Sequence, residues 1–304
     1  MKRYGVILVS TVLGLVAIVA AGAAASAFGS QSSARSFASA KERVQPNTAM
    51  KPATSLAQLR GVNFVSGCRF SHRNTDDPIV FPGQPGKSHD HTFIGNDTTN
   101  AASTLSTMLG ATSSCRRPGD TAGYWAPTLI SATGAAITPR AATVYYRRHT
   151  LMAVRPFPQD FKLIAGNSKA TAAQSLAVTY WNCGPGGGVR PQSTIPTCPD
   201  AGARGLALHV AFPDCWNGIS LDSPDHQSHM AYSAKGRCPA GQPVAMPALQ
   251  VNLRYPSAGG SGLTLSSGGQ LSGHADFFNA WNEQALRMLV NGCLNALRHC
   301  QQGV

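Results

Sequence analysis

The sequence has few charged residues and lacks the motifs of several large enzyme classes. Charged side chains make up 12% of its 304 residues. It contains no G-x-S-x-G nucleophile elbow, no G-x-G-x-x-G after a strand, no phosphate-binding P-loop and no H-E-x-x-H helix. No segment repeats at a fixed period. The sequence therefore gives no support to an α/β-hydrolase, a dinucleotide-binding enzyme, a P-loop NTPase or a metalloprotease of the H-E-x-x-H type.

Acidic residues are the scarcer of the two charge types. There are 13 Asp and Glu against 25 Lys and Arg, which gives a formal net charge of +12. The basic residues are scattered, and no run of five or more occurs, so nucleic acid is a weak interpretation for an exported chain. Attraction to an anionic cell surface or an acidic polysaccharide fits better. A generally basic secreted surface is the alternative.

The N-terminus has the three parts of a secretory signal. Lys2 and Arg3 precede an apolar run that reaches about residue 25, and Ala25-Ser26-Ala27 is an A-x-A cleavage pattern. We predict a signal peptide over residues 1–27 and a disordered Ser/Ala-rich spacer over 28–55. The alternative is an uncleaved anchor, since the run is close to the roughly 20 residues that span a bilayer. Residues 56–304 are then expected to form a single secreted domain, monomeric and free of the membrane once the signal is cleaved.

All 8 cysteines lie in the exported part, and none forms a C-x-x-C pair. A zinc-ribbon or thioredoxin-type motif therefore has no support. Disulfides are the default for an exported chain, so we expect four. Eight cysteines allow 105 pairings, of which we predict the sequential one. Its bonds are 68–115, 183–198, 215–238 and 293–300.

Short strand-like segments outnumber helical ones. Strands are predicted at 61–67, 123–130, 143–147, 175–181, 206–212 and 247–255. Pro127 within the second predicts an edge position or a bulge. A short helix is expected at residues 105–109, and one longer helix over about 276–297. This pattern predicts a mainly-β fold, a β-sandwich or jelly-roll with irregular disulfide-pinned loops and one C-terminal helix.

The stretch Ser88-His89-Asp90-His91 places two imidazoles and a carboxylate within three residues. A strand sends residues i and i+2 to the same side, so His89 and His91 would share one face and Asp90 the other. Two imidazoles on one face suit a metal ion, or a site that holds and protonates an anionic or sugar substrate. A polar loop whose side chains bond to nearby backbone is the alternative.

Two further His/Asp clusters lie downstream. Asp225, His226 and His229 form the second, and the alternative for it is a turn with exposed histidines. His274 and Asp276 form the third. There Asp276 is well placed as a helix N-cap, with His274 at the helix entrance.

The three clusters together are more informative than any one of them. Five of the 9 histidines fall in them, each cluster with an Asp within two residues, although charged residues are scarce. We therefore expect at least two of the clusters to converge on one site. The candidate site residues are His89, His91, Asp225, His226, His229, His274 and Asp276. The histidines among them are the candidate ligands of a divalent metal, although the cofactor itself stays open.

Several motifs occur in a fixed order along the chain. They are residues 86–91 with Gly95, 124–129, 145–147, 213–218, 221–226 leading to 229–232, and 273–277 with Trp281. Together they resemble the secreted domain-of-unknown-function family nineteen-ninety-six, over roughly residues 60–295. Some of its members carry a WSC-type carbohydrate-binding module, so the resemblance implies export and a cell-wall or polysaccharide context. At position 90 this chain has Asp where the family typically has a His-rich or glycine context. A role for Asp90 therefore has the weakest support.

Two functions follow as expectations. The first is a carbohydrate-active hydrolase or lyase that acts on cell-wall or environmental polysaccharide with a His/Asp-lined site. The second is a non-catalytic protein that binds the cell wall or a polysaccharide through positive charge and aromatic side chains. Both place the protein outside the cell, in association with the wall, with a glycan and not a nucleic acid as partner.

Overall fold

The computed structural model describes residues 53–300, and β-strands dominate this part of the chain. The predicted signal peptide and nearly all of the predicted spacer lie outside the described residues. The strands are β1 (Asn63–Cys68), β2 (Phe70–Asn74), β3 (His91–Gly95), β4 (Gly123–Pro127), β5 (Leu129–Ile130), β6 (Ala136–Ile137), β7 (Ala141–Arg147), β8 (Lys162–Gly166), β9 (Thr179–Cys183), β10 (Leu206–Ala211), β11 (Cys215–Trp216), β12 (Met230–Ala231), β13 (Val244–Ala245), β14 (Ala248–Arg254), β15 (Thr264–Leu265), β16 (His274–Phe278) and β17 (His299–Cys300). The helical elements are η1 (Leu56–Leu59), α1 (Leu105–Leu109), α2 (Glu283–Leu289) and the π-helical turn η2 (Val290–Asn295).

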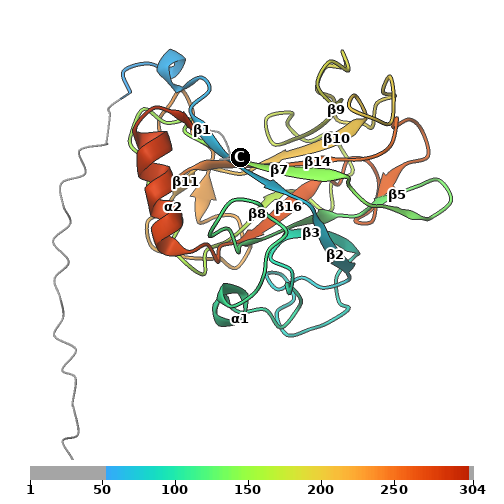
Figure 1. The fold of residues 1–304 in the computed structure, drawn as a ribbon, viewed down its shortest axis with the longest axis horizontal. Helices are drawn as coiled ribbons and strands as arrows, with labels where there is room; N and C mark the ends of the chain where they lie inside the picture. Colours follow the sequence, from blue (N-terminus) through green and yellow to red (C-terminus); the bar gives the residue numbers. More distant parts are fainter. Residues whose placement is uncertain (1–52, 301–304) are drawn as a thin grey trace, which may run out of the picture. The chain divides into compact units, whose positions relative to one another are not determined.

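Two larger sheets form the body of the domain. One has six strands in the order β17-β1-β7-β14-β10-β9, and the other has five in the order β2-β3-β4-β16-β8. Figure 1 shows β1, β7, β14, β10 and β9 side by side, with α2 at one end of the sheet. Apolar side chains of both sheets, among them Val144, Leu249, Leu163 and Phe277, share one buried cluster. The mainly-β sandwich is therefore confirmed.

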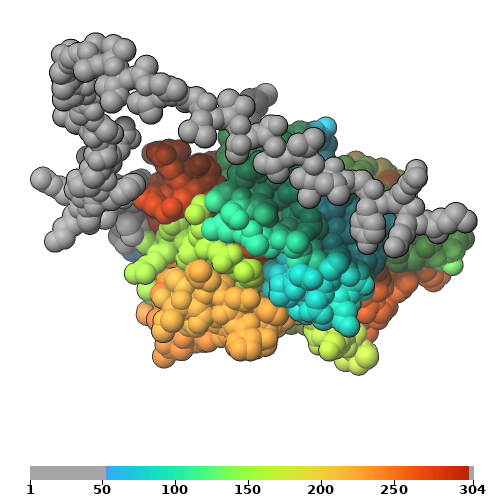
Figure 2. All heavy atoms as spheres, turned by 90° about the horizontal axis from the view of Figure 1, so that it is seen from below, coloured from blue at the N-terminus to red at the C-terminus, as the bar shows by residue number. Residues whose placement is uncertain are grey.

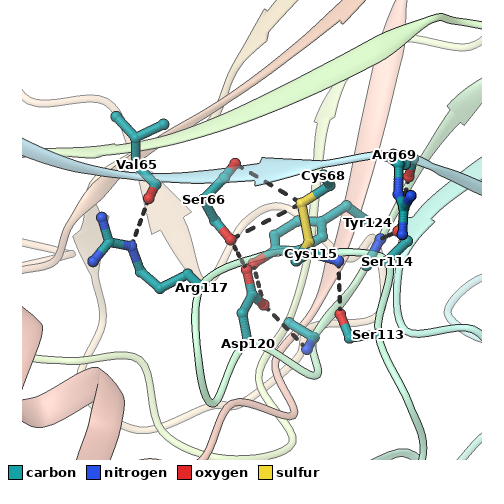
Figure 3. The surroundings of a disulfide bond; sticks show 12 residues. Val65, Ser66, Cys68, Arg69, Ser113, Ser114, Cys115, Arg117, Asp120 and Tyr124 are labelled. Carbon is teal, nitrogen blue, oxygen red and sulfur yellow. Dashed lines mark hydrogen bonds between the residues drawn. A yellow bond between two sulfur atoms is a disulfide. The ribbon is translucent and has the colours of Figure 1, made fainter. Parts of the chain in front are cut away.

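A polar network of aromatic side chains ties the two sheets together inside this core. The Tyr124 and Tyr146 hydroxyls lie 2.6 Å apart, and Trp281 Nε1 donates to Tyr146 at 2.8 Å. Tyr124 also donates to the carboxylate of Asp120 at 2.9 Å, and Ser66 donates to its other oxygen at 2.5 Å. Figure 3 shows Asp120 beneath β1, next to a disulfide bond. Because each of these polar groups has a partner, the network joins the sheets without leaving one of them unpaired.

The four disulfides follow the sequential pairing. They join Cys68 to Cys115, Cys183 to Cys198, Cys215 to Cys238 and Cys293 to Cys300. The predicted pairing is therefore confirmed, and none of the described cysteines is free. The described residues contain no helix long and apolar enough to cross a membrane.

A second, smaller core covers the outer face of the five-stranded sheet. Phe93, Trp125 and Phe278 point outward from this sheet and pack against Ile79 and Met108. Both of these covering residues belong to the segment between β2 and β4, which includes the predicted short helix, now α1. This segment places the loop before β3 directly over β16, and so positions the candidate site.

The start of the C-terminal helix differs from its prediction. Helix α2 begins at Glu283, and its N-cap is Asn282, whose side chain accepts from Ala285 N. Asp276 is therefore no helix cap, and His274 does not lie at a helix entrance. Both belong to strand β16, which pairs with β4 and β8. The sheet takes this segment because Ala275 and Phe277 alternate with outward-facing residues, a period of two that suits a strand.

Pro127 also lies elsewhere than predicted. Strand β4 is the central strand of the five-stranded sheet, flanked by β3 and β16, and is no edge strand. Pro127 is its last residue, opposite His91. A proline lacks the N–H that would continue the ladder, so it ends the strand here.

Candidate metal centre

Three imidazoles from two distant parts of the chain meet on the outer face of the five-stranded sheet. His91 is the first residue of β3, His274 is the first residue of β16, and His89 lies in the loop just before β3. The ring centres of His89 and His91 are 4.2 Å apart. The ring centre of His274 lies 5.0 Å from that of His89 and 5.9 Å from that of His91. One side-chain nitrogen of each lies within 4.8 Å of the other two. Two of the three predicted clusters therefore converge.

Backbone carbonyls orient two of these rings. His91 Nδ1 lies 2.9 Å from the carbonyl oxygen of Asp76, and His274 Nδ1 lies 2.9 Å from that of Ser272. A carbonyl only accepts, so each Nδ1 carries the proton and donates it. Each Nε2 then presents a lone pair to the centre of the cluster. Metal-binding histidines are held in this manner, because the second hydrogen bond fixes both the tautomer and the ring orientation.

A buried carboxylate without partners faces the same place. Asp276 is 1% exposed, and neither of its side-chain oxygens has a hydrogen-bond partner among the described residues. The buried Nε2 of His91 has none either. An unpaired buried polar atom costs about 1–3 kcal/mol, so three of them at one place need an explanation. A cation held by the imidazoles would take the lone pair of His91 and would place a partner beside the carboxyl group of Asp276.

Asp77 supplies a second carboxylate. Its Oδ1 accepts from Ile79 N and Val80 N, both at 2.9 Å. Oxygens of Asp77 and Asp276 and a nitrogen of His91 all lie within 4.8 Å of one another. His91 is thus shared between a set of three imidazoles and a set with two carboxylates.

Burial dominates the electrostatics of the centre. It raises the pKa of Asp276 well above its usual value, and the nearby Asp77 raises it further. Burial also raises the pKa of Asp77, against the effect of its two backbone hydrogen bonds. Desolvation lowers the pKa of His89 and His91, and that of His274 to about 4. The imidazoles are therefore neutral at pH 7, the form that binds a metal.

The spacing of the imidazoles fits a tetrahedral ion. Nε2 of His89 and Nε2 of His274 are 3.2 Å apart. Two nitrogens that each lie about 2.0–2.1 Å from a tetrahedral zinc ion are separated by about 3.3 Å. Three imidazoles with a position left open are a ligand set of catalytic zinc. The residues present therefore fit a divalent transition metal.

A cavity of about 340 Å³ opens onto this centre, and His89, His274 and Asp276 line its floor. Lys87 and Lys169, both exposed, and Ser88, Ser168 and Ser267 line its walls. In Figure 2 the cyan surface of the segment around residues 75–90 borders the gold surface of the segment around residue 225. The cavity thus offers cationic and hydroxyl groups to a substrate that reaches the imidazoles.

The third predicted cluster lies beside the centre but does not join it. Asp225 is exposed and caps its own turn, where its Oδ1 accepts from Ser223, Gln227 and Ser228. These hydrogen bonds hold its pKa far below the usual range. They give Asp225 a structural role in the turn.

The two histidines of that cluster face different partners. The imidazole of His226 pairs with Asp222 at 2.9 Å. It lies close enough to Asp77 to lower the pKa of that carboxyl group. The backbone carbonyl of His226 accepts from Ile164 N in β8. His229 is buried, bonds to Ser223 Oγ through Nδ1 at 2.9 Å and packs against Phe161. Neither belongs to the sets of converging ligand atoms found among the described residues. The turn is therefore a neighbour of the centre and not a ligand-bearing wall.

Of the two aspartates near His89 and His91, Asp77 belongs to the centre and Asp90 does not. Asp90 points away from the imidazoles, as the alternation predicts, and pairs with Arg73 at 2.9 Å. Asp77, in contrast, faces His91 and Asp276, although the sequence pattern does not indicate it. The Asp76-Asp77-Pro78 stretch is typical of a turn, and its distance from His274 in the chain conceals the contact with Asp276. The one available signal is that charged residues are scarce, so two adjacent Asp residues near a His cluster were informative.

The comparison with known families covers the whole of this centre. The family model described as Domain of unknown function (DUF1996) matches residues 77–281. The chain belongs to this family. The matched region of the DUF1996 chain extends from Asp77 past Asp276, and so includes the three imidazoles and both carboxylates. No curated protein and no solved structure matches the chain significantly.

Proposed function

We propose that this DUF1996 protein is a secreted metal-dependent enzyme, a hydrolase or lyase that acts on cell-wall or environmental polysaccharide. The observation that carries the proposal is the convergence of unpaired ligand atoms. His91 Nε2 and both oxygens of Asp276 are buried without partners among the described residues, and Nε2 of His89 and His274 lie 3.2 Å apart beside them. A fold does not keep such groups unpaired for stability alone.

The proposed roles follow from the geometry. His89, His91 and His274 would hold a divalent ion, and zinc suits their neutral imidazoles and their spacing. Such an ion would supply an activated water or polarise a substrate oxygen. Asp276 is the general acid or base, because its carboxyl group lines the cavity beside the imidazoles and burial raises its pKa well above the usual value, which favours the protonated form. Asp77 lies beside it and keeps that pKa raised.

The proposed substrate class follows from the residues that line the cavity and from the compartment that the disulfides indicate. Lys87 and Lys169 bring positive charge to the walls of the cavity, and three serines bring hydroxyl groups. Such walls suit a hydroxylated, acid-bearing glycan. Four disulfides are typical of proteins of oxidising compartments outside the cytosol, where such a glycan is met.

Two measurements test the proposal. Elemental analysis of the purified protein should find close to one equivalent of a transition metal per chain, and His274→Ala should lose it. An assay of sugar release from wall polysaccharides should then show turnover that His274→Ala and Asp276→Ala each abolish. Unchanged turnover in both variants would refute the catalytic role. Retention on insoluble polysaccharide without any product would favour the non-catalytic alternative.

A further inference from the structure

The outer face of the six-stranded sheet carries a second pocket, on the opposite side of the sandwich from the metal centre. Core residues of β14 such as Leu249 and Val251 point inward, and Gln250 and Asn252 point outward. Side chains of β7, β10 and β9 join them around a cavity of about 410 Å³, bordered by the glycine-rich loop 184–188. Gln250 and Asn252 are only 9% and 6% exposed. The polar face of this strand is therefore a recess in the domain and no open surface.

Hydrogen bonds across four strands hold the polar groups of this pocket in place. His209 Nε2 donates to Asn182 Oδ1 at 2.8 Å, and its Nδ1 accepts from the Gln250 amide at 3.4 Å. The same amide contacts the Tyr180 hydroxyl at 3.3 Å, and Arg147 donates to the Gln250 oxygen. These contacts define a single neutral tautomer of His209. The pocket is thus preorganised before any ligand arrives.

Aromatic rings and one unpaired amide oxygen complete the pocket. Tyr180 stacks on His209 with ring centres 4.4 Å apart, and the Arg147 guanidinium lies 4.2 Å from the centre of the Tyr145 ring. The buried Oδ1 of Asn252 has no hydrogen-bond partner among the described residues. That oxygen lies beside His209, whose pKa burial lowers and, to a smaller extent, the Asn252 side chain raises, and it has a lone pair to accept from a ligand hydroxyl group.

The charge of the pocket has one sign. Arg147 and Arg254 line it, no Asp or Glu does, and neither arginine forms an ion pair with a described carboxylate. Burial lowers the pKa of Arg147, as expected of a cation without a counterion. An arginine binds a carboxylate through two parallel N–H groups. The pocket therefore offers two carboxylate-binding groups among hydroxyl-binding amides.

Two further cavities adjoin the pocket at Arg147. Arg147 also borders a neighbouring cavity of about 440 Å³, which Arg60 and Lys235 line and no acidic residue does. Arg148 borders it too, but its buried guanidinium donates to backbone carbonyls. A third cavity of about 490 Å³ shares Arg147 and Gln250 with the first, and Asp214 also lines it. The positive charge therefore lies along the first two cavities, where Arg254, Arg147, Arg60 and Lys235 fit an extended polyanion better than a single small anion.

We propose that this face is a glycan-binding site that takes an acidic polysaccharide bearing uronate carboxylates. Arg147 and Arg254 bind the carboxylates, and Asn182, Gln250 and Asn252 bind the sugar hydroxyl groups. The site rests on residues outside the metal centre, and it holds whether or not the centre is catalytic. In an enzyme it would keep the polymer at the protein surface.

The test uses polygalacturonate as the probe and the same polymer with its carboxyl groups reduced as the neutral counterpart. The full secreted chain should bind polygalacturonate in affinity electrophoresis and calorimetry, more weakly at high salt. The reduced polymer should bind at least tenfold more weakly. Arg147→Gln/Arg254→Gln should lower the affinity for polygalacturonate at least tenfold.

A matched variant separates a specific site from general charge attraction. Arg69→Gln/Arg116→Gln also removes two positive charges, at exposed positions beside the first disulfide, and should leave binding unchanged. Equal losses in both double variants would overturn the proposal. Equal binding of the two polymers to the unmodified protein would overturn it as well, and this comparison needs no variant to fold. Neither result depends on metal content, so the proposed enzyme activity stands or falls separately.

Discussion

Nε2 of His89 and Nε2 of His274 lie 3.2 Å apart, although 185 residues separate them in the chain. The two rings come together because the segment between β2 and β4 covers the outer face of the sheet to which β16 belongs. His91 joins them from the first position of β3. The second core of the domain, built on Phe93, Trp125 and Phe278, thus serves as the support of the imidazole cluster.

Removal of one imidazole should remove the metal and its stabilising effect. We expect His274→Ala to lower metal content from about one equivalent to near zero, because two imidazoles hold the ion far less tightly than three. A ligand at a hundred times its Kd stabilises the folded state by about 2.7 kcal/mol. A chelator should therefore lower the Tm of the unmodified protein by several degrees and leave that of His274→Ala unchanged.

His299→Ala is the matched control, since His299 is exposed and belongs to β17 of the six-stranded sheet, whereas the centre lies on the five-stranded sheet. It should keep both the metal and the effect of the chelator. A Tm of the unmodified protein that does not respond to chelation, together with no metal by elemental analysis, would contradict the assignment of the centre.

Asp276→Asn should separate proton transfer from metal binding. General acid–base groups contribute about 10²- to 10⁴-fold to rate, so turnover should fall by that range while metal content stays within a factor of two. The comparison is Asp225→Asn, which alters an exposed carboxylate that caps its own turn. Its turnover should stay close to that of the unmodified protein, with a modest decrease in Tm. Equal loss of turnover in the two variants would count against the role of Asp276.

Alternation along a strand made part of this site predictable. His89 and His91 share a side and Asp90 faces away, as a period of two requires. The same period is present in β16, where Ala275 and Phe277 face the core. There it competes with a helical spacing of apolar residues that continues into α2, which begins seven residues after the predicted start. Strand pairing with β4 and β8 decided the outcome, and such pairing is not visible in a local pattern.

The sequence pattern does not indicate which distant segments come into contact. Nothing near Asp77 indicates that its carboxylate meets Asp276, since that contact depends on how a loop covers a sheet. The 225–229 turn shows the converse case. Its composition matches that of the other clusters, yet Asp225 satisfies its charge within the turn and His229 turns toward Phe161. Composition identified candidate residues, and only packing separates those that converge from those that do not.

The disulfides should differ in their contribution to stability. Cys68–Cys115 closes a loop across 47 residues, and Cys293–Cys300 closes one across 7. In the chain-entropy model, loops of these lengths give about 4 and about 2 kcal/mol. Replacement of each pair by Ser should therefore lower the free energy of unfolding more for the first pair. Urea unfolding of the two double variants, with metal present throughout, checks the order. A larger loss for the 293–300 pair would contradict it.

The buried carboxyl group of Asp120 should make stability depend on pH. Burial raises its pKa to about 7, against the opposing effect of hydrogen bonds from Ser66 and Tyr124. The folded state thus holds the proton more tightly than the unfolded state, whose Asp pKa is about 3.9. This contribution to stability is fully present below about pH 4 and is lost as the pH rises through about 7. Each pKa unit corresponds to about 1.4 kcal/mol, so the loss amounts to several kcal/mol.

Asp120→Asn should remove this pH dependence, because an amide mimics the protonated acid. Its oxygen can accept from Tyr124 or Ser66, and its NH₂ group donates as the acid O–H does. Its free energy of unfolding, measured by urea between pH 4 and 8, should decrease less with rising pH than that of the unmodified protein. The exposed Asp97 provides the control, since Asp97→Asn also removes one carboxylate. If both variants kept the pH slope of the unmodified protein, Asp120 would be ionised in the folded state, and the network that joins the two sheets would contain a buried charge.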